Sequence, residues 1–236
     1  MPPAPPPDRP IRQTDFTAAG EPRPETTVRP RDAATLILWR DGGRAGLEVL
    51  MGVRSAKHRF MPSRLVFPGG RMDLDDRNAP VASELRPETR RALELRAKPK
   101  MAHGLAVAAV RELHEETGLI MGRFEGGRLR PDLEPLRYLC RALTPPQSPV
   151  RFNARFLMAP SRAAVGSLGG TGELEHLDWY PVDETPPHEL ALITAKVLQE
   201  FRAVMAMPEE ERERRTLVWF QGRDLRRPER VAPREA

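Results

Sequence analysis

A single cysteine, Cys140, occurs among the 236 residues of the sequence. One cysteine cannot form a disulfide within the chain, and it excludes a zinc site built from several cysteines. No stretch approaches the ~18 consecutive apolar residues that a membrane-spanning helix requires. The first residues, 1–7, also lack the apolar segment of a secretory signal. We therefore expect a protein with no membrane partner and, by default, a cytoplasmic location.

Lysine is scarce as well, because 34 of the 38 basic residues are arginine. The formal net charge is +5. Proteins that bind nucleic acids gather basic side chains into a patch that releases counterions from phosphates. Here the arginines are scattered among 33 acidic residues, with no basic stripe. The composition therefore gives no reason to expect a specific nucleic-acid partner.

Proline is concentrated at one end, since nine of the 26 prolines lie within the first thirty residues. Such a segment has little apolar surface to bury, so residues 1–30 are predicted to form a disordered, proline-rich tail. Residues 31–222 have the size of one globular domain. Residues 223–236 are predicted to be a loose C-terminal tail.

Short strands and helices alternate through the domain. Apolar runs and period-2 alternation predict strands, and apolar residues at i, i+3, i+4 and i+7 predict helices. Residues 71–104 differ in character and are predicted to be an insertion that carries one helix. The expected strands are 33–39, 47–54, 65–67, 138–143, 154–158, 177–180 and 216–220, and the expected helices are 83–96, 106–117 and 189–205.

Three glutamates, Glu112, Glu115 and Glu116, stand at i, i+3 and i+4 of the predicted helix 106–117. Their carboxylates gather on one side within a turn, where like charges repel unless a cation lies between them. Hard divalent cations such as Mg²⁺ prefer carboxylate oxygens and commonly also hold substrate phosphates. Arg111 precedes Glu115 by four residues and can orient it through an ion pair. Taken alone, the glutamates also fit the solvated face of an ordinary surface helix.

Upstream, the predicted strand 65–67 breaks into the segment 67–70, FPGG, where the backbone can approach a ligand or a helix end closely. This segment, followed by RELHEETGL at 111–119, resembles the signature of the Nudix hydrolases. That signature reads G-x5-E-x7-R-E-U-x-E-E-x-G-U, where U is a bulky aliphatic residue. Its second half matches at every specified position.

The resemblance implies an α/β fold, an α/β/α sandwich around a mixed sheet, with a helical insertion. It implies Mg²⁺ or Mn²⁺ as the cofactor and a nucleotide-diphosphate small molecule as the substrate. Its metal ligands would be Glu112, Glu115 and Glu116, which are also catalytic residues together with Arg111. The substrate-binding loop would contain Gly69 and Gly70.

The first half of the signature is interrupted. Between Gly70 and Arg111 lie 40 residues where the pattern has thirteen, so 27 are extra. Counting back from Arg111 places the first acidic position of the signature on His103. We expect a glutamate of the insertion to brace the loop and Arg111 instead, with Glu84, Glu88 and Glu94 as candidates. Some relatives, including peroxisomal coenzyme A diphosphatases, carry an insertion at this point.

A second motif resembles the Nudix subgroup that acts on coenzyme A, L-L-T-x-R-[SA]-x3-R-x3-G-x3-F-P-G-G. The segment 50–70 keeps this register with three differences, and its two arginine positions are Arg54 and Arg59. Guanidinium groups bind phosphate in a bidentate way, so both are candidate substrate-binding residues. The other interpretation is that Arg54 ends a strand and Arg59 faces solvent.

The resemblance implies metal-assisted attack of water on a diphosphate bridge. The general base is a signature glutamate or a glutamate in a distant loop, with Glu173 as the first loop candidate and Glu175 as the second. Hydrolysis of coenzyme A or acyl-coenzyme A to 3′,5′-ADP and (acyl-)phosphopantetheine is the leading hypothesis. The alternatives are a Nudix hydrolase for ADP-ribose, NADH or dinucleoside polyphosphates, and a non-catalytic nucleotide-binding module. The oligomeric state, with a homodimer among the options, stays open.

Overall fold

The computed structural model of this chain describes residues 28–42, 46–56, 61–170, 172–221 and 225–229. Residues 1–27 of the predicted N-terminal tail lie outside these ranges, so the tail stays a prediction. Arg59, a predicted substrate-binding residue, also lies outside them. Within the described ranges, no helix is long and apolar enough to cross a membrane.

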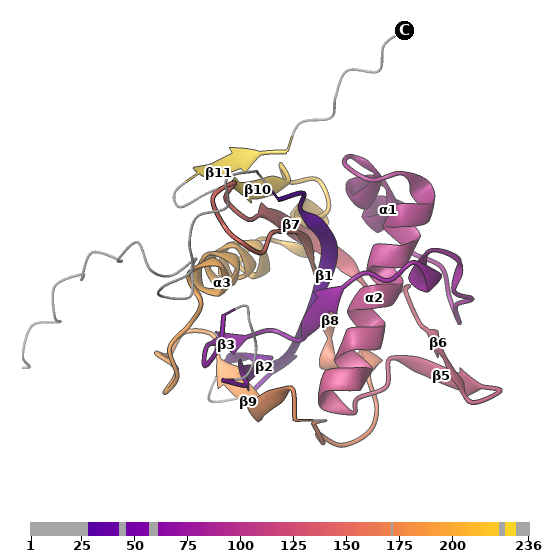
Figure 1. The fold of residues 1–236 in the computed structure, drawn as a ribbon, viewed down its shortest axis with the longest axis horizontal. Coiled ribbons are helices and arrows are strands. Elements are labelled where there is room, and N and C mark those ends of the chain that lie inside the picture. The colour runs from indigo at the N-terminus through magenta and orange to yellow at the C-terminus, as the bar shows by residue number, and fades with distance from the viewer. Residues whose placement is uncertain (1–27, 43–45, 57–60, 171, 222–224, 230–236) are drawn as a thin grey trace, which may run out of the picture.

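A mixed sheet, nine strands of which lie in the described ranges, forms the centre of the fold (Figure 1). The strands are β1 (Arg31–Asp41), β2 (Leu47–Arg54), β3 (Leu65–Val66), β4 (Gly69–Arg71), β7 (Arg137–Leu143), β8 (Phe152–Pro160), β9 (Leu174–Pro181), β10 (Val218–Gln221) and β11 (Leu225–Pro228). Their order is β11-β10-β7-β8-β1-β2-β3, while β4 pairs with β1 and β9 pairs with β2. β1 runs parallel to β8 and antiparallel to β2 and β4.

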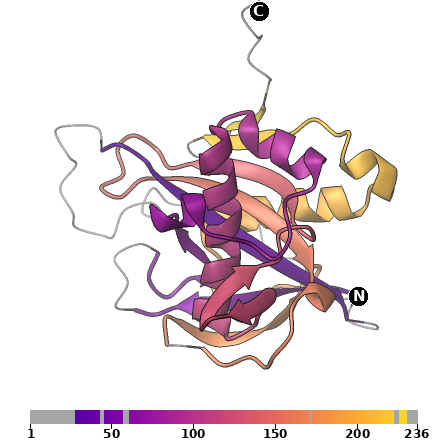
Figure 2. The same cartoon turned by 90° about the vertical axis from the view of Figure 1, so that its right-hand side faces the viewer.

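Helices cover both faces of this sheet. α2 (Pro99–Thr117) lies against one face and α3 (Leu192–Met205) against the other, as Figure 1 shows. Figure 2 views the molecule from the α2 side. α1 (Pro87–Glu94) packs beside α2, and α4 (Glu209–Arg212) follows α3 in the chain. The α/β/α sandwich around a mixed sheet is therefore confirmed.

Apolar faces of the two helices bury against the sheet. On α2, Leu105, Ala109 and Leu113 are fully buried and recur at the spacing of one helix face. On α3, Val197 and Phe201 are fully buried in a second cluster on the opposite side of the sheet. Because this apolar face packs on the sheet, the charged residues in the last turns of α2 lie on the remaining surface of the helix.

α2 begins at Pro99, seven residues before the predicted start, and so takes Gly104 into the helix. Glycine lowers helix propensity, which is why the pattern did not predict a helix here. A Cβ at position 104 would lie 2.9 Å from the Met72 sulfur and 3.2 Å from the Cα of Arg77. Gly104 therefore allows the short 3₁₀ turn η3 (Asp75–Asn78) to pack directly on α2.

The predicted helix 83–96 is shorter in the structure, where α1 has eight residues. Other elements were not predicted, because their side chains show no strand pattern. β4 consists of Gly69, Gly70 and Arg71, which form a strand because β1 supplies their hydrogen-bond partners. The two-stranded sheet of β5 (Gly122–Glu125) and β6 (Arg128–Pro131) is largely exposed and lies apart from the main sheet.

The predicted loose tail at 223–236 is wrong for residues 225–229. Four of these residues form β11, which pairs antiparallel with β10. The side chain of Glu229 is 1% exposed and accepts hydrogen bonds from Arg141 Nε at 2.6 Å and from the Tyr138 hydroxyl at 2.9 Å. A buried charge pair, rather than an apolar repeat, thus holds this segment, and such a pair leaves no periodic trace in the sequence.

Replacing Glu229 by alanine should lower the free energy of unfolding by about 3 kcal/mol, because Arg141 would stay buried without its counter-charge. Urea denaturation followed by circular dichroism measures the change. Glu210→Ala, at an exposed position of α4, is the matched control and should change stability by less than ~0.5 kcal/mol. Equal stability of the two variants would contradict a structural role for the C-terminal strand.

Candidate active site

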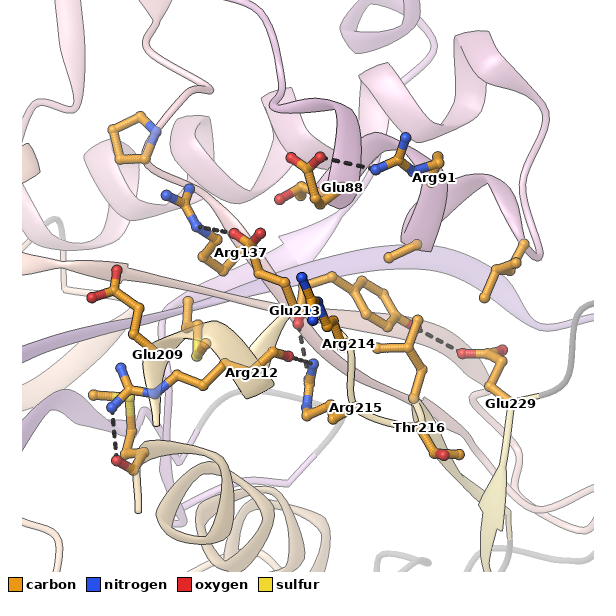
Figure 3. A pocket seen from close by; sticks show the side chains of 18 of the residues that line it. Glu88, Arg91, Arg137, Glu209, Arg212, Glu213, Arg214, Arg215, Thr216 and Glu229 are labelled. Atoms are coloured by element: carbon orange, nitrogen blue, oxygen red, sulfur yellow. Dashed lines mark hydrogen bonds and ion pairs between the residues drawn. The ribbon is translucent and has the colours of Figure 1, made fainter. Parts of the chain in front are cut away.

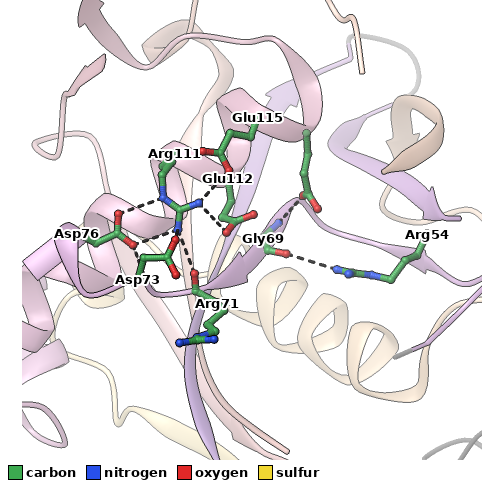
Figure 4. Close-up of polar contacts among 9 residues, drawn as sticks. Arg54, Gly69, Arg71, Asp73, Asp76, Arg111, Glu112 and Glu115 are labelled. Carbon is green, nitrogen blue, oxygen red and sulfur yellow. Dashed lines mark hydrogen bonds and ion pairs between the residues drawn. The ribbon is translucent and has the colours of Figure 1, made fainter. Parts of the chain in front are cut away.

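The last turns of α2 bring the predicted site residues to the bend where β4 begins (Figure 4). The side chain of Glu112 is 14% exposed and that of Glu115 is 52% exposed, whereas Glu116 is almost fully buried. The difference follows the helix geometry, because Glu112 and Glu116 are one turn apart on the same face. The three glutamates therefore meet different surroundings although they are close in sequence.

Arg111 uses all five of its N–H donors. Its Nε and Nη2 donate to the two carboxylate oxygens of Asp76 at 3.1 and 3.0 Å. Its Nη1 donates to Glu112 and to Glu115, each at 2.9 Å, and its Nη2 also reaches the carbonyl of Arg71 at 3.0 Å. Burial alone would lower the pKa of Arg111, but the hydrogen bond to Asp76 and the charges of Glu112 and Glu115 raise it. Arg111 is thus a permanent cation that orients two of the glutamates.

Asp76 was missed by the sequence analysis, although a simple count finds it. It is the sixth residue after Gly70. Counting forward from Gly70 therefore places the first acidic position of the signature at Asp76. Its side chain is 5% exposed, and it holds Arg111 through a bidentate pair. The extra residues therefore lie between Asp76 and Arg111, where 34 residues stand in place of seven, and not directly after Gly70.

The expectation that Glu84, Glu88 or Glu94 braces Arg111 is wrong. Glu84 pairs with Arg90 at 2.8 Å, and Glu88 pairs with Arg91 at 2.8 Å, both toward the surface. Glu94 ends α1 and lines a different cavity. His103, at the position found by counting backward, instead contacts the carbonyl of Ala79 at 2.8 Å. These contacts stabilise the insertion and not Arg111, because Asp76 of η3 already pairs with Arg111.

Gly69 and Gly70 let the backbone of β4 touch the glutamates. The N–H of Gly69 donates to Glu116 Oε2 at 2.8 Å. A Cβ at Gly70 would lie 2.5 Å from the carboxylate of Glu112, a distance at which one of the two would have to move. Any side chain at position 70 would therefore displace Glu112, which explains why a glycine is required there.

Burial makes the charges of two glutamates costly. Desolvation raises the pKa of Glu116 to about 8, against the lowering effect of the Arg54 charge and the Gly69 N–H. Desolvation also raises the pKa of Glu112, against the opposing charge of Arg111. Negative charge crowded into a partly buried space favours a bound cation.

The chemistry of these donors fits a hard divalent cation. Glu112, Glu115 and Glu116 each use one carboxylate oxygen in the contacts above, and no contact among the described residues engages their other oxygen. All-oxygen ligands are those that Mg²⁺ and Mn²⁺ prefer. Within the described ranges no three acidic, imidazole or thiol groups already converge on one metal-sized point. Binding would therefore require the free oxygens to turn toward the cation.

Glu173, the first loop candidate for the general base, lies just before β9 and is exposed. Its charge raises the pKa of both Glu112 and Glu116, so it stands within electrostatic reach of the cluster. Glu175 is also exposed and pairs in register with Val53 of β2. The structure thus brings Glu173 to the site, and its role as base stays a prediction.

Three arginines stand near the bend without a carboxylate partner among the described residues: Arg31, Arg54 and Arg71. The Nη2 of Arg54 lies 3.4 Å from the carbonyl of Gly69 (Figure 4). Arg71 is the partner of Ala33 on β1, and Arg31 is the next residue on that face of the strand. Arg31 and Arg71 were missed because neither belongs to a motif, and only the β1–β4 pairing brings them together.

Two cavities flank the sheet. The larger, of about 1360 Å³, is a groove beside α1 and α4 that shares no lining residue with the glutamate cluster (Figure 3). Among its charged side chains, Glu88 pairs with Arg91 and Arg137 pairs with Glu213. The smaller, of about 250 Å³, is lined by Arg54, Gly69 and Gly70. We therefore assign the smaller cavity to the candidate active site.

Asp76→Asn should weaken Mn²⁺ binding by about 10- to 100-fold, the usual cost of losing a group that orients a metal ligand. The amide cannot accept both N–H groups of Arg111, so Glu112 and Glu115 lose their fixed positions. Electron paramagnetic resonance of free Mn²⁺ measures the affinity. Asp73→Asn is the control, since its carboxylate is 62% exposed and 3.9 Å from Arg111. Unchanged Mn²⁺ affinity in Asp76→Asn would contradict the bracing role.

The fold is similar to that of proteins of known structure. A Nudix hydrolase of known structure from Alicyclobacillus acidocaldarius aligns over 75% of this chain and 91% of its own, with 27% identity and a TM-score of 0.55. The NUDIX domain of Shewanella oneidensis NrtR, solved with ADP ribose, aligns over 83% of this chain and all of its own, with 13% identity and a TM-score of 0.48.

A curated relative, the peroxisomal coenzyme A diphosphatase ndx-8 of Caenorhabditis elegans, is 43% identical over 53 residues. The match spans 22% of this chain and 23% of the relative, so it covers less than a quarter of either protein. No family model matches the sequence. The structural alignment nevertheless covers most of both chains. The chain therefore has the fold of the Nudix hydrolases.

Proposed function

We propose that this protein hydrolyses the diphosphate bond of a nucleotide-linked metabolite, with Mg²⁺ or Mn²⁺ as its cofactor. The observation that carries the proposal is the glutamate cluster held by Arg111 and Asp76 against the glycine bend of β4. A structural ion-pair network would not need three glutamates that each keep a free oxygen. The complete set of glutamates also argues against a non-catalytic nucleotide-binding module.

The side chains take separate tasks in this proposal. When bound, a divalent cation neutralises the charge that develops on the diphosphate oxygens and lowers the pKa of an attacking water. Glu112, Glu115 and Glu116 would hold the cation through their free oxygens. Glu173 is proposed to accept the proton of the water, because it is exposed and within electrostatic reach of the cluster. Arg54, next to Gly69, would bind a phosphate oxygen.

We propose coenzyme A or acyl-coenzyme A as the substrate, cleaved to 3′,5′-ADP and (acyl-)phosphopantetheine. The motif around Arg54 and the name of the relative from Caenorhabditis elegans support this choice. Arg31 and Arg71 support it further, because both lie on the same sheet face and line the same cavity without a carboxylate partner among the described residues, and such cations favour an anion. Coenzyme A carries a 3′-phosphate besides its diphosphate, and ADP-ribose does not.

The test is turnover of a substrate panel by the 236-residue chain with Mg²⁺ or Mn²⁺, with products identified by mass. Release of 3′,5′-ADP from coenzyme A supports the proposal. Cleavage of ADP-ribose, NADH or dinucleoside polyphosphates alone would support the alternative substrates. Binding without turnover would support the non-catalytic module. A cytoplasmic location and a homodimer stay predictions.

Glu116→Gln should lower kcat by about 100-fold or more, the effect expected when a group that stabilises developing charge is lost. The fold should persist because the amide oxygen of glutamine can still accept the Gly69 N–H. Added Mn²⁺ should raise the melting temperature of the parent chain and not that of the variant. Glu125→Gln, exposed on β5 and paired with Arg130, is the control for a glutamate outside the site. Parental turnover in Glu116→Gln would contradict the metal assignment.

Arg71→Ala should raise the KM for coenzyme A about tenfold and leave the KM for 3′-dephospho-coenzyme A unchanged, because charge-assisted hydrogen bonds are worth about 1.5–3 kcal/mol. Arg54→Ala should raise both KM values, since both substrates carry the diphosphate. Steady-state kinetics on the two substrates separate these effects. Arg123→Ala, exposed on β5, is the control. An equal effect of Arg71→Ala on both substrates would remove the argument for the 3′-phosphate.

A further inference from the structure

The cavity of about 250 Å³ beside the glycine bend exists because a row of alanines crosses the sheet. Ala33 of β1, Ala154 of β8 and Ala142 of β7 are partners in register on three neighbouring strands. Larger side chains at these positions would fill the space up to α3, because protein interiors otherwise pack without voids of this size. The three alanines therefore leave a cavity between the sheet and α3.

Aromatic side chains form the walls of this space. Phe152 and Phe156 stand on either side of Ala154 along β8, and Phe220 extends the alanine row onto β10. Phe67, which precedes the bend, completes the wall. Four of the eight phenylalanines of the chain therefore line one cavity.

The cavity and the glutamate cluster meet at the bend. Gly69, Gly70 and Arg54 line the cavity, and the same three residues contact or face the glutamates. No side chain stands between the two spaces at positions 69 and 70. A diphosphate held at the glutamates would therefore have its next substituent at the entrance of the cavity.

The lining offers little to a polar substituent. Apart from the arginines at its rim, the polar side chains among the described lining residues are Thr35, Thr144 and Thr194. The hydroxyl of Thr144 already accepts the N–H of Phe152 at 3.0 Å. A sugar or a nucleobase buried here would leave donors and acceptors unpaired, which costs free energy, whereas an aliphatic group has none to lose.

We infer that this cavity binds an aliphatic group esterified to the diphosphate and selects such substrates over sugar-linked ones. The inference rests on the proposed function, because it takes the position of the diphosphate from the glutamate cluster. In coenzyme A, the group next to the diphosphate is the dimethyl-bearing segment of the pantetheine arm. In ADP-ribose it is a second sugar, which the cavity does not suit.

Simple alkyl esters of ADP test this directly, because they carry the aliphatic group without the amides of coenzyme A. From the methyl to the butyl and hexyl ester, kcat/KM should rise about fourfold per methylene, equivalent to about 0.8 kcal/mol, until the cavity is full. ADP-ribose should be the poorer substrate. Calorimetry in EDTA should show the same increase in affinity without turnover. If neither kcat/KM nor the affinity depends on chain length, the inference is overturned.

Ala154→Leu fills the middle of the alanine row and should abolish the dependence on chain length, because the longer esters lose the space that they occupy in the parent chain. Ala142→Leu is the second variant, should Ala154→Leu fail to fold. Ala203→Leu, at an exposed position of α3, is the control and should behave as the parent chain.

The outcomes separate the inference from the function on which it rests. If Ala154→Leu lowers kcat/KM equally for the methyl ester and for ADP-ribose, the cavity binds the adenine that both substrates share. That result would overturn the inference. If the parent chain hydrolyses no ester but binds longer chains more tightly, the proposed function fails and the inference stands. Hydrolysis that is indifferent to chain length leaves the function standing and overturns the inference.

Discussion

The bidentate pair between Asp76 and Arg111 is the interaction on which the candidate site depends. Arg111 spends two of its donors on Glu112 and Glu115, and it can do so in one fixed geometry only because Asp76 holds its other edge. Three glutamates within about one turn would otherwise repel one another and spread into solvent. The pair also crosses from η3 to α2, so it joins the loop after the glycine bend to the helix that carries the cluster.

This interaction explains how the site accommodates 27 extra residues. The additional chain leaves after Asp76, forms α1, and returns at Pro99 to begin α2. Gly104 lets η3 pack on the helix, which keeps Asp76 within reach of Arg111. Because the insertion starts beyond the acid that braces the arginine, it lengthens the connection without opening the site. The ion pairs of Glu84 and Glu88 then serve the insertion alone.

The glycine bend divides the chemistry between two faces of β4. On the α2 side lie buried carboxylates whose charge calls for a cation, and on the α3 side lies a space walled by phenylalanine. Gly69 and Gly70 separate them by backbone alone. In the proposed function, hydrolysis would take place on one face of β4 and substrate selection on the other, with Arg54 next to both. Substitutions in the alanine row would then adapt the cavity to another substrate group without changing the glutamates.

The sequence by itself determined most strands and the charged turn of α2, because those follow from periodicity and from a contiguous motif, and the class of fold followed from the family resemblance that this motif carries. It also contained Asp76 at the expected spacing from Gly70, since a loop of five residues is set by local chain geometry. Only the tertiary structure decided that β4 is a strand, that Arg31 and Arg71 are neighbours, and that Glu229 is buried. Those features depend on partners supplied by distant segments, and a backbone hydrogen bond or a buried ion pair imposes no pattern on the residues around it.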